Sequence, residues 1–351
     1  MSAGIALKYA LSVQYLLRIK TEDVMYVVSR KTTGYKKLQK GLACEDFVLT
    51  KEFNDFIIMA CADGHGDRKC KYAAKGAELA TWVITKVLQD MRKVEDSIED
   101  YGVVLNDSRE EIIKKFICGW VGAVLDDYKV NHPEDTTFQQ EFKELSKYAK
   151  SIYDVRSGEM PVREFRALAE YRHRCEEAIY KITLLYGTTM NAMVVTDKFV
   201  FAIGIGDGDV VAVNGKRVEW LLPSANQFDT SPASLCGNFG VMPENFASIY
   251  VPVTKGRKLT DSFFQPEILM ISTDGLRNAF LSDESFAEKL LEIAQAFKKG
   301  DGKNFVRNSK KWLEERSMYG VTQDDIAFSL CSKYSVKPKQ IQRAKKRKTD
   351  A

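Results

Sequence analysis

Several features that mark other classes of protein are missing from this 351-residue sequence. Its seven cysteines are widely spaced, odd in number and without a CxxC pair, which argues against a disulfide framework and a zinc ribbon. No stretch reaches the roughly 18 uncharged apolar residues that span a bilayer. Lys8 interrupts the N-terminal apolar run and no positive segment precedes that run, so we expect no signal peptide. We therefore expect a cytoplasmic protein that makes no membrane contact and keeps its thiols reduced and mostly buried.

The sequence also lacks nucleotide-binding loop motifs and an excess of basic residues outside its C-terminal tail. Neither GxxxxGK[ST] nor GxGxxG follows a predicted strand, so ATP or NAD chemistry has no support. The net charge of +4 comes from the tail, because residues 337–348 hold seven Lys or Arg and no acid. The body is slightly acidic, which makes a nucleic-acid partner for the whole domain unlikely. For the tail, a disordered solvated terminus is the leading interpretation, docking to an acidic partner or nucleic acid is the next, and a nuclear address would require a eukaryotic source.

Hydrophobic patterning predicts where strands and helices lie. Short β-rich runs bounded by turn residues predict strands over 25–29, 47–50, 56–61, 188–195, 199–205, 209–213, 216–222, 248–253, 268–272 and 326–331. Asn214-Gly215 predicts a hairpin between two of these strands. Apolar stripes at three- and four-residue spacing predict helices over 73–91, 113–124, 165–182, 284–298 and 303–317.

The order of these elements predicts the fold class. Strands cluster early and late, helices cluster in the middle, and hairpins outnumber strand-helix-strand units. This pattern predicts an α+β protein whose antiparallel sheets are covered by helices. We expect an N-terminal extension over 1–20, one domain over 21–334 with a helical segment at about 91–184, and the basic tail over 335–351.

Acidic residues stand beside the ends of four predicted strands. Glu45-Asp46 and Asp324-Asp325 each precede a strand, whereas Asp63-Gly64 and Asp274-Gly275 each follow one. Carboxylates that meet in one cleft repel each other unless cations neutralise them, and hard oxygen ligands favour Mg²⁺ or Mn²⁺. Each pair alone is typical of a turn. For Asp207, between two glycines, we prefer the interpretation as a tight turn.

Motifs in a fixed order then point to one family. DGHG (63–66), YGTT (186–189), GIGDGD (204–209), MISTDGL (270–276) and TQDDIAFSL (322–330) resemble the ordered motifs of the metal-dependent protein phosphatases of type 2C. KGLACEDFV (40–48) resembles the acidic motif that opens the domain in bacterial-type members. The resemblance runs from about residue 34 to 331. It implies two antiparallel sheets packed as a sandwich, flanked by helices on both sides.

The resemblance also implies a metal site and an activity. Asp63 would bridge two divalent ions, Mn²⁺ or Mg²⁺, and the Gly64 carbonyl would bind one of them. Asp274 and Asp324 would hold the other ion, and Glu45 and Asp46 would complete the site directly or through water. The protein would be a serine/threonine phosphatase that hydrolyses phosphoproteins supplied by a cognate protein kinase, using a water that the two metals activate.

His65 is the candidate proton donor to the leaving serine or threonine alkoxide, because imidazole titrates near neutrality. Its alternative role is to orient a ligand or a metal-bound water. His132 and His173 lie in the helical segment, where surface or packing roles are more typical. Thr188 and Thr189 could bond near the site, but we favour a pairing role in the sheet for both.

One departure from the family pattern supports an alternative function. Many members carry a phosphate-gripping arginine a few residues before the Glu-Asp pair, where this chain has Gly41. Lys40 could act there as a point charge without the bidentate fork of arginine. The alternative is therefore a catalytically silent, phosphoprotein-binding regulatory module on the same fold. A third hypothesis is a nucleic-acid-binding protein recruited through its tail.

Overall fold

A computed structural model describes residues 26–150, 162–223, 234–235, 245–253 and 264–332. The expected N-terminal extension and basic tail lie outside these residues. The described strands form two five-stranded antiparallel sheets, which confirms the predicted α+β class and the sandwich. No described helix combines the length and apolar character needed to cross a membrane.

The first sheet joins the two ends of the described chain. Its strands, in spatial order, are β1 (Tyr26–Thr32), β10 (Ile326–Ser332), β9 (Ile268–Ser272), β6 (Asp209–Asn214) and β7 (Arg217–Trp220). Asn214 pairs with Arg217 across the predicted hairpin. Gly215 there has a φ of 70°, a conformation that glycine adopts without steric cost.

The second sheet contains the remaining strands in the order β2 (Phe47–Glu52), β3 (Phe56–Ala62), β4 (Met190–Thr196), β5 (Phe199–Ile205) and β8 (Ala247–Pro252). Its central strands are buried on both faces, which explains their continuous apolar sequences. In β3, Ile57 and Met59 belong to the core between the sheets, whereas Ile58 and Ala60 belong to the core under the helices. The alternation follows from the two-residue period of a strand.

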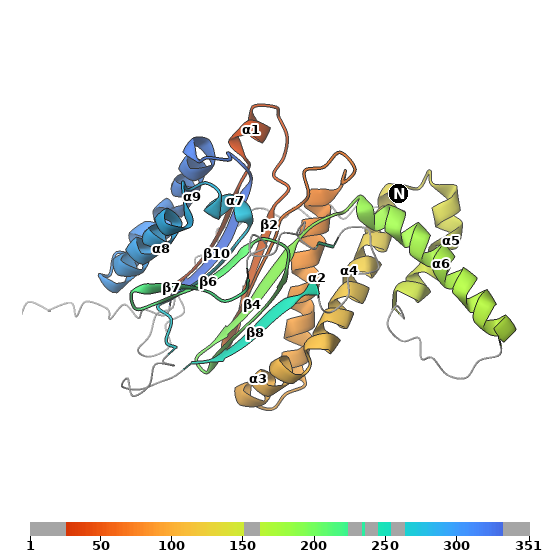
Figure 1. Cartoon of the computed structure of the whole chain (residues 1–351), viewed down its shortest axis with the longest axis horizontal. Helices are drawn as coiled ribbons and strands as arrows, with labels where there is room; N and C mark the ends of the chain where they lie inside the picture. Colours follow the sequence, from red (N-terminus) through yellow and green to blue (C-terminus); the bar gives the residue numbers. More distant parts are fainter. Residues whose placement is uncertain (1–25, 151–161, 224–233, 236–244, 254–263, 333–351) are drawn as a thin grey trace, which may run out of the picture.

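Helices cover the outer face of each sheet (Figure 1). The second sheet packs against α2 (Ala73–Lys93), α3 (Ile98–Asp107) and α4 (Arg109–Asn131), and the first against α8 (Asp283–Lys298) and α9 (Gly302–Tyr319). Beyond α4, α5 (Thr136–Lys150) and α6 (Val162–Leu184) extend away from the sheets as a helical arm. A Cβ on Gly76 of α2 would lie 1.9 Å from the Tyr186 carbonyl oxygen, so a small residue is needed there.

Two short helices lie near one end of the sandwich. The connection between β1 and β2 contains α1 (Tyr35–Leu38), and α7 (Asp274–Arg277) follows β9 directly. Neither is long enough to show a periodic apolar stripe, so neither is predictable from hydrophobic spacing. Both lie next to the acidic residues that follow or precede the strands.

Candidate functional site

Three aspartates from three separate segments meet between the sheets. Phe47 pairs with Ala62, so Asp46 just before β2 lies beside Asp63 just after β3. The side chain of Asp63 shares hydrogen bonds with Asp46 and with Asp274, the first residue of α7. Thr273 Oγ1 donates to Asp46 Oδ2 at 2.7 Å and thereby ties the end of β9 to the start of β2. The fold thus builds one cluster from residues far apart in the sequence.

The electrostatics of this cluster oppose ionisation. Burial, followed by the negative charge of Asp325, raises the pKa of Asp46 to about 8. Burial and the charges of Asp46 and Asp274 hold the pKa of Asp63 well above its usual range. Burial raises the pKa of Asp274 as well. The cluster therefore needs bound protons or a bound cation near neutral pH.

Two further aspartates stand at the margin of the cluster. Asp324 is exposed, accepts a hydrogen bond from the Asp325 backbone at 2.8 Å, and raises the pKa of Asp274 through its charge. Asp207 acts on Asp274 in the same way, more strongly. Our interpretation of Asp207 as a turn residue describes its backbone, where Gly206 has a φ of 113°, but misses its place beside the cluster. The available signal was a third Asp-Gly pair after an apolar strand.

The turn that carries Asp63 is held by backbone and hydroxyl groups. Thr189 donates its backbone N–H to the Asp63 carbonyl at 2.9 Å, and Thr188 Oγ1 donates to the same oxygen at 2.7 Å. The Asp63 N–H donates to Thr189 Oγ1 at 3.1 Å. Both threonines therefore position this turn. The expected pairing role within the sheet was wrong, because β4 begins at Met190 and Thr188 pairs with Gly64 only in an isolated bridge. A Cβ on Gly64 would lie 2.6 Å from the Glu45 carbonyl oxygen, so only glycine fits this approach.

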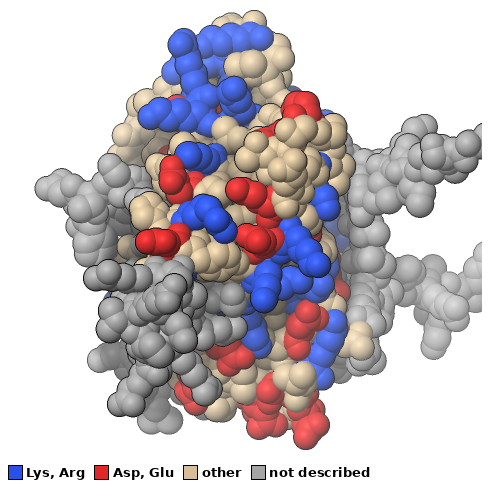
Figure 2. Space-filling view, turned by 90° about the vertical axis from the view of Figure 1, so that its right-hand side faces the viewer, with Lys and Arg blue, Asp and Glu red and all other residues tan. Residues whose placement is uncertain are grey.

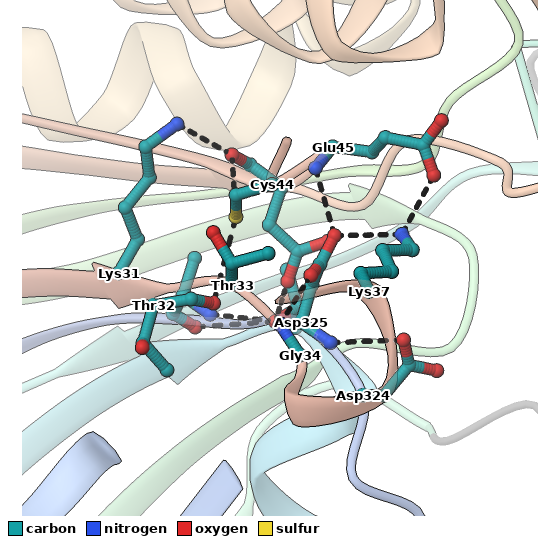
Figure 3. A network of polar contacts seen from close by, with 12 residues as sticks. Lys31, Thr32, Thr33, Gly34, Lys37, Cys44, Glu45, Asp324 and Asp325 are labelled. Carbon is teal, nitrogen blue, oxygen red and sulfur yellow. Dashed lines mark hydrogen bonds and ion pairs between the residues drawn. The ribbon is translucent and has the colours of Figure 1, made fainter. Parts of the chain in front are cut away.

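A network around Asp325 joins the segments that carry the outer acids (Figure 3). The buried Asp325 carboxylate accepts from Gly34 N at 2.6 Å, from Glu45 N at 2.7 Å and from Lys37 Nζ at 2.7 Å. Lys37 Nζ also donates to Glu45 Oε2 at 2.6 Å. The side chains of the neighbours Glu45 and Asp46 thus have different partners. Asp46 joins the aspartate cluster, whereas Glu45 pairs with Lys37. Lys37, rather than Lys40, is the lysine that the structure joins to these acids.

His65 follows the cluster on the chain. Its backbone N–H donates to the Gly187 carbonyl at 3.0 Å, and its ring makes no hydrogen bond to another described residue. Burial lowers the pKa of His65, while the charges of Asp207 and Asp67 act in the opposite direction. His132 lies far along the helical segment, stacks on Tyr128 and contacts Glu134 at 2.9 Å, which is a packing role.

The chemistry of the cluster fits hard divalent cations, although its side chains do not form a ready-made site. Among the described residues, no group of three or more His, Cys, Asp or Glu is arranged to hold a metal ion. The Asp63 side chain instead shares hydrogen bonds with Asp46 and with Asp274. The atoms that these side chains offer to a metal are all oxygens, and the charges that act most strongly on Asp46 and Asp63 are all negative. Such a set favours Mg²⁺ or Mn²⁺ over softer metals.

Comparison with solved structures identifies similar folds at low identity. The chain is 12% identical to the Mycobacterium tuberculosis serine/threonine phosphatase PstP/Ppp, covering 88% of this chain and 98% of that one, with a TM-score of 0.47. It is 13% identical to the serine/threonine phosphatase Stp1 from Staphylococcus aureus (92% and 98% covered, TM-score 0.44) and 14% identical to RsbX in complex with magnesium (90% and 98%, TM-score 0.41). At these identities and TM-scores, nothing about activity is transferred to this chain.

A family model gives the stronger result. The model described as protein phosphatase 2C matches residues 33–315, which include Asp46, Asp63 and Asp274 but not Asp324. A search of curated proteins found no match. Because the family model covers most of the chain, this protein belongs to the protein phosphatase 2C family.

Proposed function

We propose that this chain is a metal-dependent phosphatase that removes phosphate from serine or threonine side chains of phosphoproteins. The observation that carries the proposal is the meeting of Asp46, Asp63 and Asp274 from three separate segments, where burial and mutual repulsion oppose ionisation unless protons or cations balance the charge. Membership of the protein phosphatase 2C family supports this proposal.

The residues of the cluster would hold two ions, Mn²⁺ or Mg²⁺. We assign Asp63 and the Gly64 carbonyl to the centre of the site, because Asp63 lies between Asp46 and Asp274. Asp46, Asp274 and Asp324 would complete the ligand set, and Glu45 would contribute from its position beside Lys37, through water. When bound, the ions would supply positive charge for the phosphate ester and make a water molecule more acidic.

His65 would act as the general acid. Its place two residues after Asp63 sets it at the edge of the cluster, and its ring is free of other protein hydrogen bonds among the described residues. The leaving alkoxide needs a proton, and a group whose pKa is near the working pH can supply it. Burial lowers the pKa of His65, and the charges of the nearby Asp207 and Asp67 partly offset this by favouring the protonated imidazole.

One observation favours the alternative, a catalytically silent phosphoprotein-binding module. Lys37, the lysine that the structure joins to the acids of the site, already pairs with Glu45 and Asp325, so it is engaged and does not replace the missing phosphate-gripping arginine. This module would bind a phosphoprotein without hydrolysing it. The two functions differ in a directly measurable property.

The test is hydrolysis of p-nitrophenyl phosphate and of a phosphothreonine peptide in Mn²⁺. We expect activity that EDTA abolishes and that Asp63→Asn loses, together with Mn²⁺ binding by calorimetry to the wild type only. Wild-type protein that is inert in Mn²⁺ and Mg²⁺ across a range of pH would refute the enzyme. Phosphopeptide binding by that inert protein would then favour the silent module.

A further inference from the structure

Exposed apolar side chains concentrate at the end of the molecule where α1 lies. Of the eleven large hydrophobic side chains that are exposed among the described residues, six belong to three neighbouring segments. These six are Leu38 and Leu42, Met318, Tyr319 and Val321, and Leu281. Single exposed apolar residues are ordinary, whereas a gathering of them marks a contact surface.

Hydrogen bonds hold these segments next to one another. Tyr35 N donates to Ser317 Oγ at 3.1 Å, which joins α1 to the end of α9. Lys36 Nζ donates to the Thr322 carbonyl at 2.9 Å, which joins α1 to the loop before β10. Leu42 N donates to the Lys37 carbonyl at 3.0 Å, so the chain after α1 folds back onto it. A Cβ on Gly320 would lie 2.7 Å from Ala279 Cβ, which places the segment of Leu281 beside the end of α9. The exposed apolar groups on these segments therefore share one region.

The same region is positively charged. Lys36, Lys37 and Lys40 stand within residues 35–41 without an acid, and Lys36 and Lys40 are exposed. Figure 2 shows Lys and Arg side chains gathered at the upper end of the molecule, the end at which Figure 1 places α1. The cations surround apolar side chains, which is the composition of a surface for a segment with acidic and apolar residues.

This surface borders the candidate site. Lys37 of α1 contacts Glu45, the neighbour of Asp46. A Cβ on Gly34, the residue before α1, would lie 2.6 Å from the Asp324 carbonyl carbon. A polypeptide whose phosphorylated side chain reaches the aspartate cluster would therefore pass beside α1.

We infer that the surface formed by Lys36, Leu38, Lys40, Leu42, Tyr319 and Val321, the α1 surface, binds the part of a phosphoprotein substrate that flanks the phosphorylated residue. This inference rests on the proposed phosphatase function and names the substrate class: segments with acidic and apolar residues next to phosphoserine or phosphothreonine.

The experiment compares phosphothreonine peptides that differ only in their flanks: acidic with apolar, acidic alone, apolar alone, and neither. The readout is the ratio of kcat/KM between peptides within one protein, so that a loss of folded protein cancels. The variants are Lys36→Glu with Lys40→Glu, and Leu38→Ser with Leu42→Ser. Lys143→Glu with Lys147→Glu is the matched control, because these lysines are also exposed and four residues apart, on α5 in the helical arm.

We expect the wild type to prefer the acidic, apolar peptide. Lys36→Glu with Lys40→Glu should reduce the preference for acidic flanks about tenfold, as charge reversal at a rim does, and high salt should reduce it in the wild type. Leu38→Ser with Leu42→Ser should reduce the preference for apolar flanks, and the α5 control should retain both preferences.

Other outcomes overturn the inference in distinguishable ways. Wild-type protein that hydrolyses p-nitrophenyl phosphate but treats all four peptides equally refutes the inference and leaves the phosphatase function intact. Wild-type protein that hydrolyses neither kind of substrate refutes both. A dimer in light scattering that Lys36→Glu with Lys40→Glu dissociates would assign the α1 surface to contact between copies of this chain.

Discussion

Replacing Asp63 by asparagine should stabilise the metal-free protein while removing its response to metal. Asparagine has nearly the same shape as aspartate, and its amide can donate to the carboxylates of Asp46 and Asp274, which Asp63 already contacts. The substitution thus replaces an acid that must bind a proton or repel its neighbours in the metal-free fold by a neutral donor. A residue kept for stability alone would show the opposite result.

The magnitude follows from the raised pKa values. The pKa of Asp46 is about 8 in the folded state against an ordinary value of 3.8. The stabilisation that its bound proton gives is therefore complete below pH 3.8 and is lost as the pH rises to about 8. A proton held only by the folded state changes the free energy of unfolding by about 1.4 kcal/mol per pH unit. The metal-free wild type should therefore lose about 2 kcal/mol between roughly pH 6 and pH 8.

In Asp63→Asn this loss should be smaller, because one repelling carboxylate is gone. Two charges about 4 Å apart interact by about 4 kcal/mol at the effective dielectric constant of a protein. We expect the metal-free variant to exceed the wild type by about 2–4 kcal/mol near pH 8, and by less near pH 6. Mn²⁺ at about 100 times its dissociation constant should add about 2.7 kcal/mol to the wild type and nothing to the variant.

Thermal unfolding at both pH values, with EDTA and with Mn²⁺, measures these differences. Asp209→Asn is the matched control, since Asp209 is a buried aspartate that pairs with Arg277 at 3.2 Å and accepts from Trp220 at 3.1 Å. Neutralising Asp209 leaves the buried guanidinium of Arg277 with only the exposed Asp283, at 3.4 Å, as its acidic partner and should destabilise by about 3 kcal/mol. The reasoning is refuted if metal-free Asp63→Asn is less stable than the wild type near pH 8, or if Mn²⁺ stabilises both equally.

Three further substitutions test separate parts of the site. His65→Gln should slow phosphothreonine peptide hydrolysis by about 100-fold or more. It should slow p-nitrophenyl phosphate hydrolysis far less, because p-nitrophenolate leaves without a proton. Equal slowing of both reactions in steady-state assays contradicts the acid role. Lys37→Met leaves the buried Asp325 without its cation, so denaturant titration should show that the free energy of unfolding falls by about 1–3 kcal/mol. Calorimetry should show a weaker Mn²⁺ affinity, which Lys37→Arg partly restores. Unchanged affinity in Lys37→Met argues against a positioning role. Gly64→Ala places a Cβ 2.6 Å from a backbone oxygen and should abolish Mn²⁺ binding in calorimetry. The control Gly122→Ala, with nothing within 4 Å of its Cβ, should bind Mn²⁺ as the wild type does. Binding by both variants contradicts the proposed role of Gly64.

Much of the fold was predictable because its signals are local. The predicted bounds of β5 and β9 match the structure, since apolar strands there are ended by turn residues on both sides. The helical segment was predicted, but α5 was not separated from its neighbours. Its buried residues Phe138, Leu145 and Ala149 lie at spacings of seven and four, so this helix was readable from the sequence.

The arrangement within the site was less predictable, because it depends on contacts between distant segments. Sequence reasoning named Glu45 and Asp46 together, as neighbours with equal chemistry. Their separation arises from Lys37, which holds Glu45 and also reaches Asp325 across 288 residues of sequence. Asp207 was overlooked for a related reason, since its turn is evident from the sequence whereas its effect on Asp274 requires the packing of β6 against β9.

The contrast between Asp209 and Asp63 shows why the cluster calls for a functional explanation. Asp209 has a cation and an indole N–H as partners, so folding alone accounts for its presence. Asp63 has other acids as its side-chain partners, and an arrangement of this kind lowers the stability of the metal-free fold near neutral pH. Apolar residues or a single paired acid would fill the same space at less cost. Carboxylates that oppose folding are retained where they bind something positive, and the oxygen-only donor set selects a hard divalent cation.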